Sequence, residues 1–95
     1  MSEPFDPGRV EQALEHLPGW AGDTSALTKT FHFDDFSAAI DFMARAAPRI
    51  DEMDHHPEWT NVYDRVDVRL SSHDAHGVTG RDVRLAEVLD QVAAD

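Results

Sequence analysis

The sequence predicts an α+β domain in which a four-stranded antiparallel sheet carries three helices on one face. Three segments place apolar residues at helical spacing, and the segments between them have the lengths and patterns of short strands. The resulting order is helix-strand-strand-helix-strand-strand-helix, which packs most economically as one sheet with a single helical layer. Ninety-five residues suffice for one core, so we expect a single domain spanning residues 1–95.

The first half of the chain begins with a predicted helix over residues 7–17, which Pro18 and Gly19 stop. A short strand is expected over residues 20–22 and a longer one over residues 26–33. In the longer strand, alternate residues share a face. One face carries Leu27, Phe31 and Phe33, and the other carries Thr28, Thr30 and His32.

A second helix is expected to follow Asp34 or Asp35 as its N-cap and to run to about Asp51. Pro48 removes one backbone donor inside this helix, so we expect a kink or an early end there. The apolar stripe that the sequence suggests for this helix comprises Phe36, Ala39, Ile40, Met43, Ala47 and Ile50.

The second half of the chain is predicted to contain a hairpin and a last helix. Strands are expected over residues 58–63 and 66–72, with Asp64 and Arg65 as the turn. Thr79 has the features of a helix N-cap, and Asp82 three residues later completes an acidic variant of the capping box. The stripe of this helix comprises Leu85, Val88, Leu89 and Val92.

Composition excludes several classes of function. The chain has 19 acidic and 8 basic residues, a formal net charge of −11, which opposes binding to nucleic acid or to anionic lipid. Because there is no cysteine, neither disulfides nor a cysteine nucleophile is available. The sequence has no apolar run long enough to span a bilayer and no leader-like start, so we expect a cytoplasmic protein.

Three of the six histidines lie where predicted elements end, which is where functional side chains concentrate. His55 and His56 follow the second helix, and His73 follows the fourth strand. Histidine titrates near neutral pH without special help, so such a group can both donate and accept protons. Neighbours on extended backbone point to opposite sides, however, so His55 and His56 need not share a pocket. The carboxylates close to them in sequence are Asp51, Glu52, Asp54 and Asp74.

A metal site is the main alternative for these histidines. His73, Asp74 and His76 together with the His55-His56 pair offer enough donors for zinc. Their spacing fits no helical HExxH motif, because residues 73–76 fall in a loop, and we therefore expect no bound metal. His16, His32 and His76 are interpreted as solvated surface residues.

A gapped pattern of residues runs along most of the chain. Its core is His55-His56-Pro57-Glu58-Trp59, preceded by an acidic residue four positions before His55, and the third histidine comes ten residues after Tyr63. The other residues of the pattern are Trp20, Phe31 to Phe36, Ala39, Phe42, Met43, Asp51, Asn61 to Tyr63, Ser72 to Asp74, Gly77 to Thr79 and Asp82. Over roughly residues 14–92, this pattern resembles the pterin-4a-carbinolamine dehydratase family.

The resemblance implies a reaction and roles for individual residues. Members dehydrate a 4a-hydroxytetrahydropterin to the quinonoid dihydropterin, which a reductase recycles, without a metal or an organic cofactor. By matched position, His55 and His73 would be the general acid/base pair, and His56 would bind and orient the pterin. Asp51 stands where the family more often has Glu. The remaining substrate-site residues would be Asp51, Asp54, Ser71, Ser72, Asp74 and Asp82, the last of which also serves as a helix-start residue.

Two other functions stay open beside the dehydratase. The same fold serves in some relatives as a non-catalytic dimerisation or assembly module, although such a protein would be expected to lose some of the three histidines. A related activity on another pterin, such as one linked to molybdopterin metabolism, would keep them. Family members form dimers or tetramers, so the resemblance implies a homo-oligomer.

Overall fold

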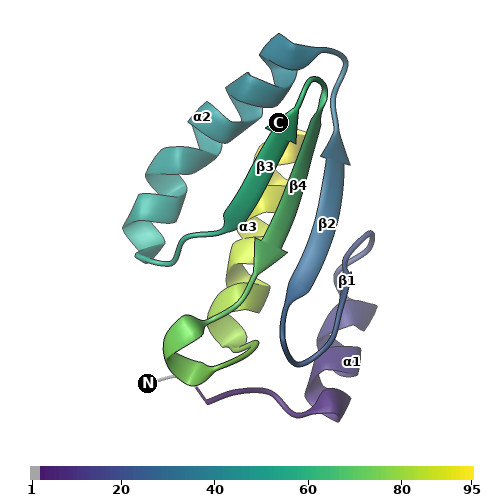
Figure 1. Cartoon of the computed structure of the whole chain (residues 1–95), viewed down its shortest axis with the longest axis vertical. Coiled ribbons are helices and arrows are strands. Elements are labelled where there is room, and N and C mark those ends of the chain that lie inside the picture. Colours follow the sequence, from purple (N-terminus) through teal and green to yellow (C-terminus); the bar gives the residue numbers. More distant parts are fainter. Residues whose placement is uncertain (1–2) are drawn as a thin grey trace.

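A four-stranded antiparallel sheet with the strand order β1-β2-β4-β3 is central to the computed structural model, which describes residues 3–95 (Figure 1). The predicted fold class and element order are confirmed, and the predicted boundaries lie within two residues of those observed. The elements are α1 (Pro7–Glu15), β1 (Ala21–Gly22), β2 (Leu27–His32), α2 (Phe36–Met53), β3 (Glu58–Val62), β4 (Arg65–Leu70), the 3₁₀ helix η1 (His73–Ala75) and α3 (Gly80–Ala94).

The two faces of the sheet differ in polarity because side chains alternate along each strand. In β4, Val66, Val68 and Leu70 are buried, while the intervening residues point to the open face. The same strand pairs with β2 and β3 on its two sides, so it lies inside the sheet. The alternation predicted from the sequence is therefore observed.

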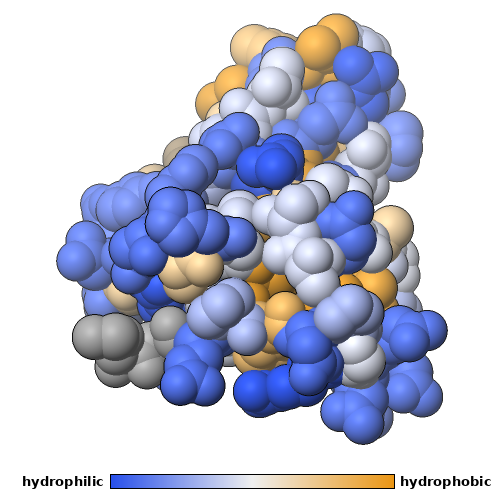
Figure 2. All heavy atoms as spheres, turned by 60° about the horizontal axis from the view of Figure 1, so that its bottom comes forward, coloured by the Kyte–Doolittle hydropathy of each residue, from blue (hydrophilic) through white to orange (hydrophobic). Residues whose placement is uncertain are grey.

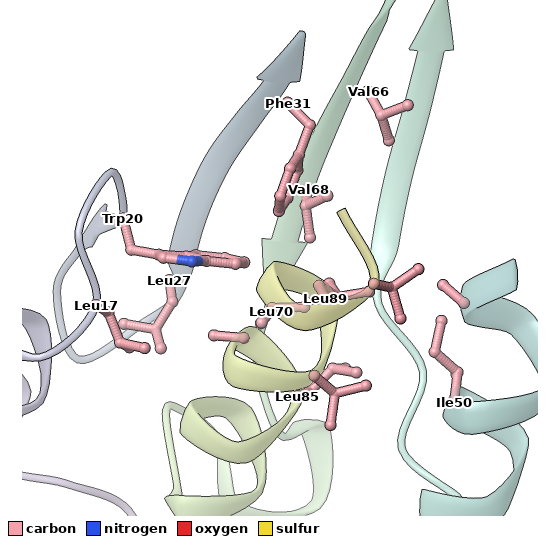
Figure 3. Packing of buried hydrophobic residues seen from close by; sticks show 14 of the residues in the cluster. Leu17, Trp20, Leu27, Phe31, Ile50, Val66, Val68, Leu70, Leu85 and Leu89 are labelled. Carbon is pink, nitrogen blue, oxygen red and sulfur yellow. The ribbon is translucent and has the colours of Figure 1, made fainter. Parts of the chain in front are cut away.

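One hydrophobic core lies between the sheet and the helices (Figure 3). Helix α1 contributes Val10, α2 contributes Phe42 and Ile50, and α3 contributes Leu85 and Leu89. The α3 stripe predicted from the sequence is buried in full. The sheet side of the core comprises Leu27, Phe31, Val66, Val68 and Leu70.

The buried face of α2 differs from the predicted stripe. Ala39 and Ile50 are buried as expected, but the core also takes Phe42 and Ala46. The other predicted members lie partly or fully outside the core: Phe36, Ile40 and Ala47 are exposed, and Met43 is only partly buried. The helix has two adjacent apolar lines, and periodicity alone does not show which of them faces the sheet.

Of the two outcomes predicted for Pro48, a kink or an early end of α2, the early end is wrong, because the helix continues to Met53. Pro48 and Ala44, whose carbonyl would have accepted the missing hydrogen bond, are both exposed. Water can bond that carbonyl, so one lost backbone bond does not end the helix. The predicted N-cap is confirmed as Asp35, whose Oδ1 accepts a hydrogen bond from the Ala38 amide at 2.8 Å.

The β3–β4 turn lies one residue earlier than predicted, at Tyr63 and Asp64. Tyr63 has a φ of 51°, which most side chains disfavour and which a two-residue hairpin turn demands. The Asn61 side chain supports it by donating to the Tyr63 and Arg65 carbonyls at 3.1 and 3.0 Å.

Hydrophilic side chains cover most of the molecular end that comes forward in Figure 2. Within residues 3–95, none of the helices has the length and apolar character that crossing a membrane requires.

Candidate functional site

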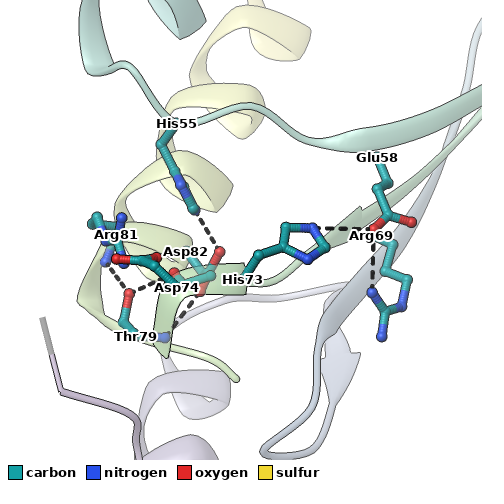
Figure 4. A network of polar contacts seen from close by, with 9 residues as sticks. His55, Glu58, Arg69, His73, Asp74, Thr79, Arg81 and Asp82 are labelled. Atoms are coloured by element: carbon teal, nitrogen blue, oxygen red, sulfur yellow. Dashed lines mark hydrogen bonds and ion pairs between the residues drawn. The ribbon is translucent and has the colours of Figure 1, made fainter. Parts of the chain in front are cut away.

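Four polar side chains are buried together where α2, β4 and α3 meet. They are His55, Ser72, Thr79 and Asp82, and we call them the buried polar cluster. Asp82 is fully buried and lies at its centre (Figure 4). Its Oδ1 is 2.7 Å from His55 Nε2, and its Oδ2 accepts hydrogen bonds from the Ser72 hydroxyl at 2.8 Å and the Thr79 amide at 2.9 Å.

For the remaining hydrogen bonds of the cluster, only one assignment of donors and acceptors is consistent. Because the Ser72 hydroxyl donates to Asp82, the Thr79 hydroxyl must donate to Ser72, 2.8 Å away. Thr79 in turn accepts from the Arg81 amide at 3.2 Å. Asp82 acts as an acceptor toward all three partners, so His55 Nε2 carries the proton and Nδ1 is the nitrogen left for other chemistry.

Local backbone geometry explains how His55 reaches this cluster. Asp54 ends α2 in the left-handed conformation, with a φ of 50°, which Asp tolerates better than most residues. The chain then runs extended toward β3, so that consecutive side chains alternate. His55 consequently points inward and is 9% exposed, whereas Asp54 and His56 are exposed.

The loop that carries the third histidine is closed at its base by Ser72 and Gly77, which form an isolated antiparallel bridge. Gly77 is required there, since a Cβ would lie 2.6 Å from the Thr24 carbonyl oxygen. Between them His73 begins η1 and His76 ends it with a φ of 59°. The bridge thus holds Ser72 in the buried polar cluster and His73 at its rim.

His56 and His73 each face a different carboxylate from His55. His56 Nε2 is 3.0 Å from Asp51 Oδ1, and both side chains are largely exposed. The His73 ring points away from Asp82 and toward Glu58 (Figure 4), with 3.5 Å between Nε2 and Oε1. Arg69 approaches the same Glu58 oxygen at 3.5 Å, so these are ion-pair contacts rather than short hydrogen bonds.

Asp74 follows His73 and is held by Arg81, whose guanidinium donates to Oδ1 at 2.7 Å. This hydrogen bond, helped by the positive charge of Arg81, lowers the pKa of Asp74 below its ordinary value. Ser71, the last of the predicted site residues, is half-buried at the end of β4.

Of the predicted site residues, the structure therefore brings together His55, Ser72 and Asp82. His56 instead contacts Asp51, and His73 contacts Glu58, outside this cluster. A cavity of about 410 Å³ is lined by His55 but not by His56 or His73. Within residues 3–95, no three His, Asp or Glu side chains converge as metal ligands would. Sequence reasoning included Glu58 in the family pattern without giving it a role, and it missed Arg81, which adjoins Asp82.

The structure is a small α+β domain in which a buried aspartate holds a histidine, an arrangement that can transfer protons or orient a polar ligand. The sequence model described as pterin 4 alpha carbinolamine dehydratase matches residues 3–92. The chain belongs to this family.

Individual relatives are similar in sequence to this chain along most or nearly all of its length. A protein of Nitrobacter winogradskyi is 50% identical over 95 residues, covering 98% of this chain and 94% of the relative. One of Burkholderia ambifaria is 51% identical over 83 residues, covering 85% of this chain and 81% of the relative. Both carry the provisional name pterin-4-alpha-carbinolamine dehydratase.

A solved structure shares the fold closely. The crystal structure of a protein named transcriptional coactivator/pterin dehydratase, from Brucella melitensis, aligns with a TM-score of 0.92 and 41% sequence identity. The alignment covers 96% of this chain and 99% of that one.

Proposed function

We propose that this protein dehydrates a pterin-4a-carbinolamine to the quinonoid dihydropterin by general acid/base catalysis. In this reaction the C4a–O bond breaks, the hydroxyl leaves as water after protonation, and a base removes a proton from a ring nitrogen. Family membership and the names of the relatives support the substrate class. The observation that carries the mechanism is the buried pairing of His55 with Asp82, which orients one imidazole nitrogen before any substrate arrives.

The three histidines have different roles in this proposal. His55 and His73 transfer protons at the 4a centre, and His56 orients the pterin. The contacts support such a division, because His55 has a fixed environment while His73 is 81% exposed and free to approach a ligand. In this proposal Asp51, Asp54, Ser71 and Asp74 belong to the substrate side, whereas Ser72 and Asp82 are fully buried and act through His55.

The decisive experiment is a dehydration assay of wild type beside His73→Ala, following the decay of the 4a-hydroxytetrahydropterin absorbance. We expect wild type to accelerate the decay and His73→Ala to lower kcat by about 10²-fold or more. His76→Ala is the matched control, since His76 is an exposed histidine of the same loop. Equal rates for wild type and buffer would end the proposal.

Metal removal gives an independent check of the mechanism. The proposed chemistry needs only imidazoles, so incubation with EDTA followed by the same assay should leave the rate unchanged. Loss of activity that added zinc restores would instead show that a metal takes part.

A second candidate is a non-catalytic interaction module. The specific observation in its favour is the name of the similar Brucella melitensis protein, which is called a transcriptional coactivator as well as a pterin dehydratase. Absence of dehydration by a folded wild-type protein, on pterins of several side chains, would favour this candidate.

We also propose that the protein forms homodimers or homotetramers. A domain of this size buries a limited share of its surface, and α2 leaves Phe36 and Ile40 about half exposed on one side. Light scattering should give a mass above the 10.6 kDa of one chain, and Ile40→Glu should lower it. A monomeric wild type at high concentration would contradict the proposal.

A further inference from the structure

Apart from His55 itself, the side chains that line the cavity next to His55 take no part in the proposed proton transfers. It lies between the last turns of α2 and the first turns of α3 and has a volume of about 410 Å³. We call it the arginine pocket, after three of its lining residues, Arg49, Arg81 and Arg84. The others are Glu52, Met53, His55 and Val88.

Charge is distributed unusually in this pocket. The whole chain has 8 Lys and Arg against 19 Asp and Glu, yet three of those 8 cations line one small cavity. Glu52 is the single carboxylate in the lining, so the wall carries a net positive charge. A concave wall of one sign concentrates its field, and here the field attracts anions to a protein that otherwise repels them.

The guanidinium groups also retain donors that no described side chain uses. Arg81 Nε is buried, and within residues 3–95 it is the one buried side-chain nitrogen or oxygen without a hydrogen-bond partner. Asp74 occupies only another nitrogen of Arg81. Arg84 makes no ion pair with the described residues, and Arg49 donates only to the neutral Gln91 side chain at 3.2 Å. A buried donor without an acceptor is costly. Arg49 and Arg84 are exposed, so their unused donors are the ones that an anion in the pocket can reach.

Phosphoryl groups suit this set of donors best. Planar guanidinium groups donate two parallel hydrogen bonds to phosphate oxygens, and several arginines can share the three oxygens of one phosphoryl group. The cavity is larger than a phosphate ion and falls within the range of small-ligand sites, which leaves room for carbon atoms attached to the phosphoryl group.

We propose that the arginine pocket binds a phosphoryl group next to His55, either as part of the pterin side chain or as free phosphate. The pterin-borne form rests on the proposed dehydratase function, because His55 lines both sites. The free form does not depend on it. Figure 4 shows Arg81 and His73 on opposite sides of the His55–Asp82 hydrogen bond, so the phosphoryl group and His73 would approach His55 from different directions.

The first test is a titration of the protein with inorganic phosphate, read from the NMR signals of the arginine Nε–H groups. We expect a saturable shift of the Arg81 signal in wild type. The double variant Arg49→Gln/Arg84→Gln should bind phosphate at least about tenfold more weakly, because each charged hydrogen bond is worth that much or more. Arg9→Gln/Arg65→Gln is the matched control, since it loses the same charge outside the pocket. No saturable shift in wild type, or equal weakening in both variants, would overturn the proposal.

The second test identifies where the phosphoryl group comes from. Wild type and the pocket variant are compared on two carbinolamines, one with a phosphorylated side chain and one with a neutral side chain. For each protein, kcat/KM for the phosphorylated substrate is divided by kcat/KM for the neutral one. If this ratio is about tenfold lower in the pocket variant than in wild type, the phosphoryl group belongs to the pterin. An unchanged ratio with weakened phosphate binding assigns the pocket to free phosphate. If wild type dehydrates neither pterin, the proposed function fails, while the phosphate titration still decides whether the pocket binds anions.

Discussion

His55 and His56 are neighbours in the chain and each pairs with an aspartate, yet their surroundings are opposite. The His55 side chain is 10% exposed and its partner Asp82 fully buried, whereas the His56 and Asp51 side chains are 60% and 75% exposed. The distances are similar, 2.7 and 3.0 Å. Alternation along extended backbone is sufficient to produce this difference, because it directs one side chain inward and the next outward.

The two histidine–aspartate pairs have similar distances, but we expect them to contribute differently to the stability of the fold. Asp51 and His56 remain hydrated when apart, so their pairing adds little to stability. Asp82 has no water to replace His55, Ser72 or the Thr79 amide, so each bond in the buried polar cluster must be kept. The buried pair therefore fixes an imidazole at a defined angle, and the exposed pair leaves its imidazole free to rotate toward a ligand.

The largest expected effect is that of Asp82→Ala on stability. Removing the central acceptor leaves three buried donors unsatisfied, and we expect the free energy of unfolding to fall by about 3–5 kcal/mol. Urea denaturation followed by circular dichroism measures this loss. Asp51→Ala is the matched control and should change stability by less than about 0.5 kcal/mol. Equal losses in the two variants would mean that burial does not distinguish the pairs.

The second prediction compares the catalytic effects of the two histidines. Under the proposed mechanism, His55→Ala should lower kcat by about 10²-fold, since it would remove a proton-transfer group. His56→Ala should mainly raise KM, because it removes binding that is equal in substrate and transition state. Steady-state kinetics with a 4a-hydroxytetrahydropterin separates the two constants. Small and equal changes in both variants would show that the roles are assigned wrongly.

Parts of this arrangement could be predicted from the sequence, because they depend on local patterns. The capping box of Thr79 and Asp82 is one, since a side chain three residues after the cap reaches back to the cap amide. The predicted alternation of β4 is another. Both follow from backbone geometry over a few residues.

Other parts depend on contacts between distant segments. Asp82 and His55 are 27 residues apart, and their hydrogen bond arises only when α3 packs beside the end of α2. The choice between the two apolar lines of α2 has the same origin, since Phe42 packs against Phe31 and Trp59 of the sheet. Periodicity contains no information about which neighbour a helix face will meet.

The N-caps of α2 and α3 allow the same comparison of a buried with an exposed contact, with smaller expected changes in the free energy of unfolding. Thr79 caps α3 from within the buried polar cluster, and Asp35 caps α2 at an exposed position. Asp35→Ala should cost about 1 kcal/mol of unfolding free energy. Thr79→Ala should cost more, because it also removes the donor to Ser72. Chemical denaturation of both variants tests the order, and a larger loss for Asp35→Ala would contradict it.

The smallest expected effect concerns Asp74, an exposed carboxylate at the rim of the same cluster. The hydrogen bond from Arg81 lowers the pKa of Asp74 in the folded protein, so the associated stability is present above the unfolded pKa of about 3.9 and is lost as the pH falls through the lower folded value. Arg81→Gln should raise the pKa of Asp74 toward its ordinary value, as NMR titration of the carboxyl carbon would show. Arg84→Gln, which removes an arginine without an ion pair to Asp74, should move it less. An equal rise of the Asp74 pKa in both variants would mean that the loss of one positive charge, rather than of the Arg81 hydrogen bond, changes this pKa.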